Sequence, residues 1–156
     1  MNSEMLRIMT EAIGRPLRKV IASVHLFEGK LDDEPLAIWL SFEGLGWIHL
    51  AGASDGWRLA VDGTLPEPAD MEESGEIVVV DLSNKTVFRQ MAGKELKGAW
   101  LMESPAGEPT GVRFDFGLRT RPVIINRDDE LRIAADYSPE NWEEIMETRL
   151  PEVAAG

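Results

Sequence analysis

The stretch "LRKVIASVHLFEGKLDDEPLAIWLSFEGLGWIHLAG", residues 17–52, decides the fold of this chain. Within it, apolar and polar residues alternate over 17–27, 36–42 and 47–52, and such alternation is typical of strands that bury one face. The connections over 28–35 and 43–46 are short and contain glycine. A further run, "WRLAV" (57–61), follows the turn signal "SDG". The pattern predicts an antiparallel meander built from these four runs.

The chain beyond the meander contains further strand signals. The continuous apolar run "IVVVDL" (77–82) predicts a strand that is buried on both faces. The segment 83–93 fits a short helix, with a strand as the alternative. The runs 96–104 and 111–117 predict one hairpin, and the runs 122–126 and 130–135 predict a second, with Arg127-Asp128-Asp129 as its turn.

Helices are expected at both ends. Ser3 is a suitable cap for a helix that Gly14 and Pro16 end. Ser138-Pro139 opens a closing helix, because proline is favoured at the first helical position. Its apolar stripe consists of Trp142, Ile145, Met146 and Leu150. The sequence thus predicts one α+β domain over residues 1–156, with both helices packed on a curved, mainly antiparallel sheet of about eight strands.

Composition narrows the class of protein. The chain has 156 residues, of which 44% are hydrophobic and 28% charged, as expected of a globular domain. It contains no apolar run of membrane-spanning length, so we expect no membrane association. The absence of cysteine excludes disulfides and thiolate chemistry. The N-terminal residues lack the pattern of a signal peptide, and we expect a cytoplasmic location.

Negative charge is concentrated in two segments. The net charge is −12, and residues 31–81 contain twelve acids and a single base, Arg58. A long loop over 62–76 holds six of these acids, and residues 128–156 add nine more. Such a field repels phosphates, which argues against direct nucleic-acid binding. It favours either a basic protein partner or simple solubility. The bases of residues 82–127 are expected to pair with the protein's own acids.

No motif predicts a reaction. His25 and His49 fall on strands separated by a third, roughly 10 Å apart, which is too far for one zinc ion. The chain has no H-E-x-x-H, G-x-S-x-G or phosphate-loop pattern. Its acidic runs do not match the ligand spacing of an EF-hand. We therefore predict no catalytic residue, metal or cofactor, and favour a binding protein over an enzyme.

Candidate partner-binding residues are acids and tryptophans. Trp39 and Trp47 lie on the less apolar face of the meander, where tryptophans serve as binding hot spots if they are exposed. In the alternative, this face is covered and forms a second core layer. The full set of candidates is Asp70, Glu72, Glu73, Asp128, Asp129, Glu130, Trp39 and Trp47.

The alternating "GVRFDFG", the hairpin "VIINRDDELRI" and the acidic 62–76 loop give the chain a general resemblance. It resembles small acidic bacterial immunity proteins of toxin–immunity pairs. The resemblance implies inhibition of a basic partner by masking its active site, with acids that steer association and an aromatic anchor. Other hypotheses are a small-molecule binder or enzyme with a pocket on the tryptophan-bearing face, a nucleic-acid-mimicking inhibitor, and a secretion chaperone. A pocket lined by Trp39, Trp47, His25 and a carboxylate would favour the first of these.

Overall fold

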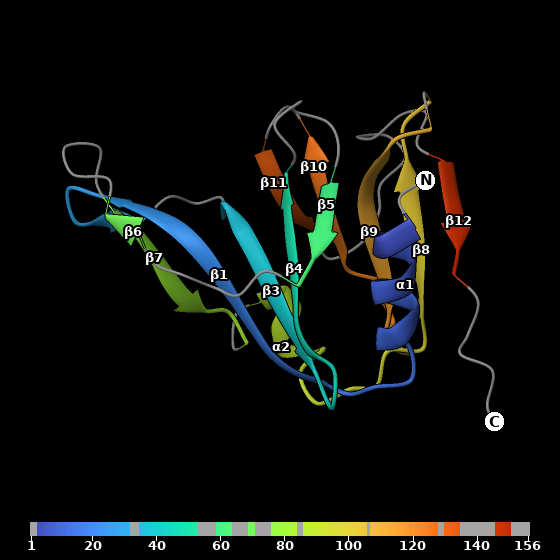
Figure 1. Cartoon of the computed structure of the whole chain (residues 1–156). Helices are drawn as coiled ribbons and strands as arrows, with labels where there is room; N and C mark the ends of the chain where they lie inside the picture. Colours follow the sequence, from blue (N-terminus) through green and yellow to red (C-terminus); the bar gives the residue numbers. More distant parts are fainter. Residues whose placement is uncertain are drawn as a thin grey trace.

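The computed structural model describes residues 3–31, 35–52, 59–63, 69–70, 76–83, 86–105, 107–127, 130–134 and 146–150 (Figure 1). The predicted N-terminal helix is confirmed as α1, Ser3–Ala12. Gly14 ends it with φ +91°, a left-handed conformation that glycine adopts without strain. Pro16 then leads into the first strand.

The meander is confirmed. Strands β1 (Leu17–Phe27), β3 (Ala37–Phe42), β4 (Gly46–Gly52) and β5 (Leu59–Asp62) pair antiparallel in this order. The two-residue strand β2 (Lys30–Leu31) folds back on the end of β1. Alternation along these strands directs Val20, Ile38, Leu40 and Leu50 to the core face.

The run 77–82 forms β7 (Glu76–Asp81), which pairs with the other side of β1. Strand β6 (Ala69–Asp70) pairs only with the beginning of β7, so the sheet has the order β5-β4-β3-β1-β7-β6. The prediction that this run is buried on both faces is wrong, because Val79 is 36% exposed. An apolar run indicates that a strand tolerates burial, but it does not show how much of the strand the rest of the molecule covers.

The expectation of a single sheet is also wrong. The short helix α2 (Thr86–Arg89) leads from β7 to a second sheet, in which the two predicted hairpins are confirmed. Its strands are β8 (Gly98–Glu103), β9 (Pro109–Asp115), β10 (Val123–Arg127) and β11 (Glu130–Ala134). Strand β12 (Met146–Arg149) completes the order β11-β10-β9-β8-β12. Two sheets form because each has one strongly apolar face, and these faces bury one another.

The predicted closing helix is wrong over residues 146–149. These residues form β12, which pairs antiparallel with β8. Leu150 then donates its backbone N–H to Ala99 O at 2.8 Å and is buried. Although the apolar residues of this segment have helical spacing, the segment forms a strand, because the backbone groups at the edge of β8 gain hydrogen-bond partners from it. Ser138, Pro139, Trp142 and Ile145 lie outside the described residues.

One apolar cluster joins α1 with both sheets. Met5, Met9 and Ala12 of α1 pack with residues of the larger sheet and with Leu101 and Phe114 of the second sheet. Each such side chain contributes about 1.5–3 kcal/mol when fully buried. In the part of the chain that the structure describes, no helix combines the length and apolar character needed to cross a membrane.

One end of the larger sheet extends away from the second sheet (Figure 1). It is formed by the last residues of β1 together with β2, β6 and the beginning of β7. We call residues 26–31, 36, 69–70 and 76–79 the distal end. The N-terminal half of β1 belongs to the core, whereas its C-terminal residue Phe27 is exposed.

Candidate functional site

The part of the tryptophan-bearing face around Trp39 forms a second, smaller cluster of buried residues. Trp39 is 4% exposed and packs with Ile21 and Ala37, while Trp47 and Ala51 lie partly buried against them. This agrees with the alternative in which the face is covered. We therefore leave Trp39 out of any docking surface.

A histidine–aspartate pair lies beside Trp39. The register aligns Trp39, His49 and Asp62 on neighbouring strands β3, β4 and β5. His49 Nδ1 lies 2.9 Å from Asp62 Oδ1, and the imidazole stacks on the Trp39 ring at a centroid distance of 4.8 Å. The contact with Asp62 and the stacking on Trp39 fix the orientation of the imidazole.

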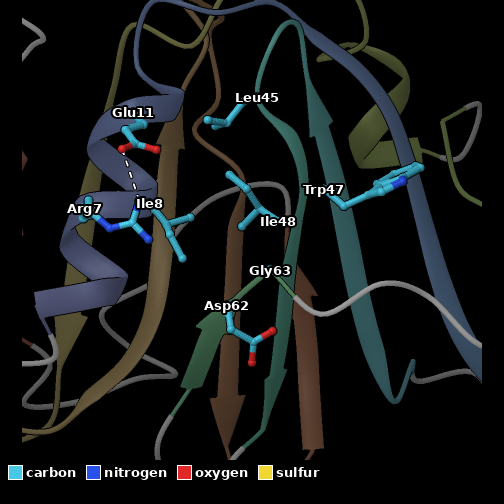
Figure 2. Close-up of a pocket in the computed structure, with 8 residues that line it drawn as sticks. All are labelled: Arg7, Ile8, Glu11, Leu45, Trp47, Ile48, Asp62 and Gly63. Atoms are coloured by element: carbon cyan, nitrogen blue, oxygen red, sulfur yellow. Dashed lines mark hydrogen bonds and ion pairs between the residues drawn. The ribbon is translucent and has the colours of Figure 1, made fainter.

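A groove of about 220 Å³, whose lining includes Asp62, lies between α1 and the beginning of β4. Figure 2 shows Ile8 and Ile48 facing each other across it, whereas the Trp47 indole points away from α1. Arg7 and Glu11 form an ion pair at 3.2 Å on its α1 side. The lining residues are Arg7, Ile8, Glu11, Leu45, Trp47, Ile48, Asp62 and Gly63. The volume is below the roughly 300–1,000 Å³ of most ligand sites.

The two histidines are not brought together. His25 lies on β1 and His49 on β4, with β3 between these strands, as the sequence predicts. Among the residues that the structure describes, no cluster of three or more histidine, aspartate or glutamate side chains is placed to hold a metal ion.

The distal end carries the exposed apolar side chains. The large hydrophobic residues that are most exposed in the described part of the chain are Phe27 (45%), Leu31 (45%), Leu36 (47%) and Val79 (36%). Phe27 and Val79 lie on the tryptophan-bearing face, and Phe27 stacks with His25 at 6.2 Å. Leu31 and Leu36 belong to the opposite face, since Leu31 pairs with Leu26 and Leu36 alternates with Ala37. The apolar surface therefore wraps around this end of the sheet.

Acidic side chains flank this surface along β7. Glu76 and Asp81, at the two ends of the strand, are both exposed. Asp81 Oδ1 accepts a hydrogen bond from the Ser83 backbone N–H at 2.8 Å, and Lys19 Nζ lies 3.9 Å from Oδ2. These hydrogen bonds from Ser83, together with the Lys19 ammonium, hold the pKa of Asp81 below its ordinary value of 3.8. Asp81 therefore remains anionic at any physiological pH.

Two of the predicted acids, Asp70 and Glu130, lie on different sheets. Asp70 belongs to β6, at one edge of the larger sheet, and Glu130 begins β11, at an edge of the second sheet. Because β11 contacts β4, it lies towards the opposite side of the larger sheet from β6. Glu72, Glu73, Asp128 and Asp129 lie outside the described residues. Asp70 and Glu130 are thus far apart in the arrangement of the strands.

Basic side chains gather on the second sheet. The guanidinium groups of Arg113 and Arg121 lie 4.2 and 4.9 Å from the centre of the Trp100 ring, as cation–π contacts. Elsewhere, Lys19 pairs with Asp81 and Lys97 with Glu95. Lys97 is thus one of the bases of residues 82–127 that pairs with an acid of the chain, as predicted, whereas Lys19 lies outside that range.

Comparison of the chain with protein-family models, with curated proteins and with solved structures found no match. Arguments about function therefore rest on the geometry of the chain itself.

Sequence reasoning missed the distal end and the His49–Asp62 pair. The pairing of β1 with β7 spans many residues, and no local pattern reveals it. One signal was present for β7, because Glu76 and Asp81 bracket its apolar run. Charged flanks of this kind are typical of strands at the edge of a sheet.

Proposed function

We propose that this protein is an acidic protein-binding module that acts in the cytoplasm. It docks through the distal end of its larger sheet onto a basic protein and masks that partner, as the immunity proteins that it resembles mask their toxins. The observation that carries the proposal is the gathering of Phe27, Leu31, Leu36 and Val79 at one end of the fold. Exposed apolar groups that cluster and are rimmed by charge mark interaction sites.

Charge supports the choice of a basic partner. Glu28, Glu76 and Asp81 are exposed at or beside the distal end, where exposed bases include Lys30 within β2 and Lys19, which lies 3.9 Å from Asp81. Asp70 begins the connection that carries Glu72 and Glu73. In such an interface, apolar anchors supply most of the affinity, whereas rim acids accelerate association and select against acidic proteins.

Affinity capture from the native host, followed by identification of the captured protein, tests the proposal. We expect a basic protein to bind stoichiometrically and to associate more slowly as salt is raised. The double variant Phe27→Ser/Leu36→Ser removes two apolar anchors and should weaken binding by about tenfold or more.

A matched pair of charge reversals locates the surface. Glu76→Lys changes the acidic rim, whereas Glu108→Lys makes the same change at an exposed position in the turn between β8 and β9. Only Glu76→Lys should slow association. Equal effects of the two reversals, or capture of an acidic partner, would contradict docking through the distal end.

A second candidate function is small-molecule binding at the groove beside the His49–Asp62 pair. The observation that favours it is the 2.9 Å contact that fixes the imidazole next to the groove lining. A screen of polar metabolites by thermal shift tests it, with Asp62→Asn as the variant that should lose the response. A metabolite that stabilises both proteins equally would place the ligand elsewhere.

A further inference from the structure

The groove between α1 and the beginning of β4 lies where β5 ends. Strand β5 pairs with β4 over His49–Gly52 and stops at Asp62, so among the described strands only β3 lies beside the beginning of β4. Figure 2 shows Asp62 towards one end of the groove and Leu45 towards the other, with Ile48 of β4 facing Ile8 of α1 between them. The groove therefore exists because β5 is shorter than the strand with which it pairs.

The walls of the groove are mainly aliphatic. Ile8 and Ile48 belong to the main core cluster, and Leu45 is partly buried against that cluster. These three side chains present methyl and methylene groups to a molecule that occupies the groove. Such walls favour a ligand that carries a short hydrocarbon chain, because removal of CH₂ groups from water contributes to affinity.

Charge gives the groove a preference for a cation. Its described lining contains one base, Arg7, and two acids, Glu11 and Asp62, for a net charge of −1. Arg7 and Glu11 form an ion pair with each other at 3.2 Å along α1, so they largely neutralise one another. Arg15, which donates to the backbone carbonyls of Glu11 and Glu43, is not among the described lining residues. The charge that remains is therefore that of Asp62, on the strand side of the groove.

Asp62 is held in a defined position. His49 Nδ1 lies 2.9 Å from Asp62 Oδ1, and the imidazole stacks on the buried Trp39 ring. The Asp62 side chain is 38% exposed, so it contacts solvent as well as His49. The two oxygens of an ionised carboxylate accept about four hydrogen bonds, so Asp62 is able to accept an ammonium donor in addition to its present contacts. A side chain that is already held in place loses little freedom when a ligand binds.

The volume of the groove limits the ligand to a small molecule. Because each water occupies about 30 Å³ of liquid, the 220 Å³ of the groove hold about seven non-hydrogen atoms. A primary ammonium group on a chain of about four to six carbons matches this size. It also matches the aliphatic walls and the carboxylate of Asp62, whereas an anion of the same size would be repelled by Asp62.

We propose that the groove between α1 and the beginning of β4 binds a small primary alkylamine, with its ammonium group at Asp62 and its hydrocarbon chain between Ile8 and Ile48. The inference rests on the second candidate function, small-molecule binding at this groove, and names the chemical class of the ligand. It is independent of docking through the distal end, because the register places the beginning of β4 beside the opposite end of β1, through Phe42 and Leu17.

NMR titration of the full chain with n-hexylamine tests the inference, at low salt and about pH 8, where the amine is charged and an ordinary histidine is neutral. Hexanoate and hexanol carry chains of the same length and serve as the anionic and neutral controls. We expect n-hexylamine to shift the amide signals of Ile8, Ile48 and Gly63 with a Kd of about 1 mM or below. Both controls should bind at least about tenfold more weakly. Equal affinity for the three compounds, or shifts confined to other parts of the chain, would overturn the proposal.

Substitutions in the protein provide the matched test. Asp62→Asn keeps the size of the side chain and should weaken n-hexylamine binding by about tenfold or more, with less than about threefold change for hexanol. Glu108→Gln removes the same charge from the exposed turn between β8 and β9 and should change neither affinity by more than about threefold. Leu45→Ser shortens the aliphatic wall and should weaken the amine and the alcohol equally. Equal effects of Asp62→Asn and Glu108→Gln, or wild-type amine binding by Leu45→Ser, would contradict this placement of the ligand.

Two further outcomes separate this inference from the second candidate function. A metabolite without an amino group that stabilises the wild type, but not Asp62→Asn, would leave the groove as a binding site and refute the amine as its ligand. Failure of n-hexylamine and of every metabolite to bind at the groove would refute both proposals together.

Discussion

Proline substitutions at Val79 and Val80 test the orientation of β7 through stability alone. Leu82 donates its N–H to Val20 O, and every second residue of an antiparallel strand faces the same neighbour, so we infer that the N–H of Val80 faces the fully buried Ala22 of β1. Val80→Pro removes this N–H. The lost hydrogen bond costs about 0.5–1.5 kcal/mol, and the unsatisfied carbonyl adds about 1–3 kcal/mol. We expect a total loss of about 2–4 kcal/mol, which lowers the Tm of a chain of this size by about 5–15 °C. By the same alternation the N–H of Val79 faces away from β1, so Val79→Pro removes no bond to β1 and should cost less than about 1 kcal/mol.

Thermal and urea unfolding measure both variants, and amide exchange of the wild-type protein supplies an independent reading. Val78 and Val80 should be protected, whereas Val79 and Asp81 should exchange much faster. Equal destabilisation by the two prolines would refute this orientation of β7.

Three other predictions concern the fold. Gly111→Ala would place its Cβ 2.9 Å from the Ile124 carbonyl oxygen and should lower the free energy of unfolding in urea by about 1–3 kcal/mol. The control Gly63→Ala meets nothing within 4 Å and should leave stability unchanged. Equal costs of the two substitutions would contradict the close approach of β9 and β10. Phe114→Ala empties a fully buried site between the sheets and should cost about 3–5 kcal/mol, so a loss below 1 kcal/mol in the same assay would speak against the shared core. Because the pKa of Asp81 is lowered, the stability that its carboxylate contributes is complete above its ordinary pKa of 3.8 and disappears as the pH falls through the lowered value. The difference between wild type and Asp81→Asn in unfolding experiments should therefore shrink on acidification, and a difference that grew instead would contradict the sign of this shift.

Local patterns predicted the local parts of the fold. The alternation over 17–52 and the short turns between its runs suffice for the meander, because strands joined by short connections pair with each other. The same holds for the β8–β9 and β10–β11 hairpins. Each of these pairings is decided within a short stretch of chain.

Pairings between distant segments could not be predicted in this way. The side of β1 that receives β7 and the edge of β8 that receives β12 depend on which backbone groups remain unpaired after the local strands have formed. Met146 and Leu150 fit a helical stripe, yet the edge of β8 overrode that spacing. Tertiary contacts routinely outweigh propensity in strands of this length.

The sequence drew attention to acids and tryptophans as candidate site residues. Its acidity indicated the segment that includes Asp70, which lies in the distal end. Tryptophan content drew attention to Trp39, which is buried, because composition does not distinguish an anchor for a partner from a core residue. The exposure of Phe27 and Leu36 depends on how far the second sheet extends along the larger sheet. That extent is determined by how the two sheets pack together, and no local pattern of residues shows it.

The two neighbours of β1 join it at different times. Strand β3 follows β1 closely along the chain, whereas β7 follows only after β3, β4, β5 and β6. Closing the longer loop costs more chain entropy, and contacts of high sequence separation form slowly. We therefore expect the meander to assemble first and β7 to be added late. During synthesis, the side of β1 that later pairs with β7 is then unpaired for a time. The rate of folding, rather than the stability of the folded protein, determines how long that side stays accessible to other chains.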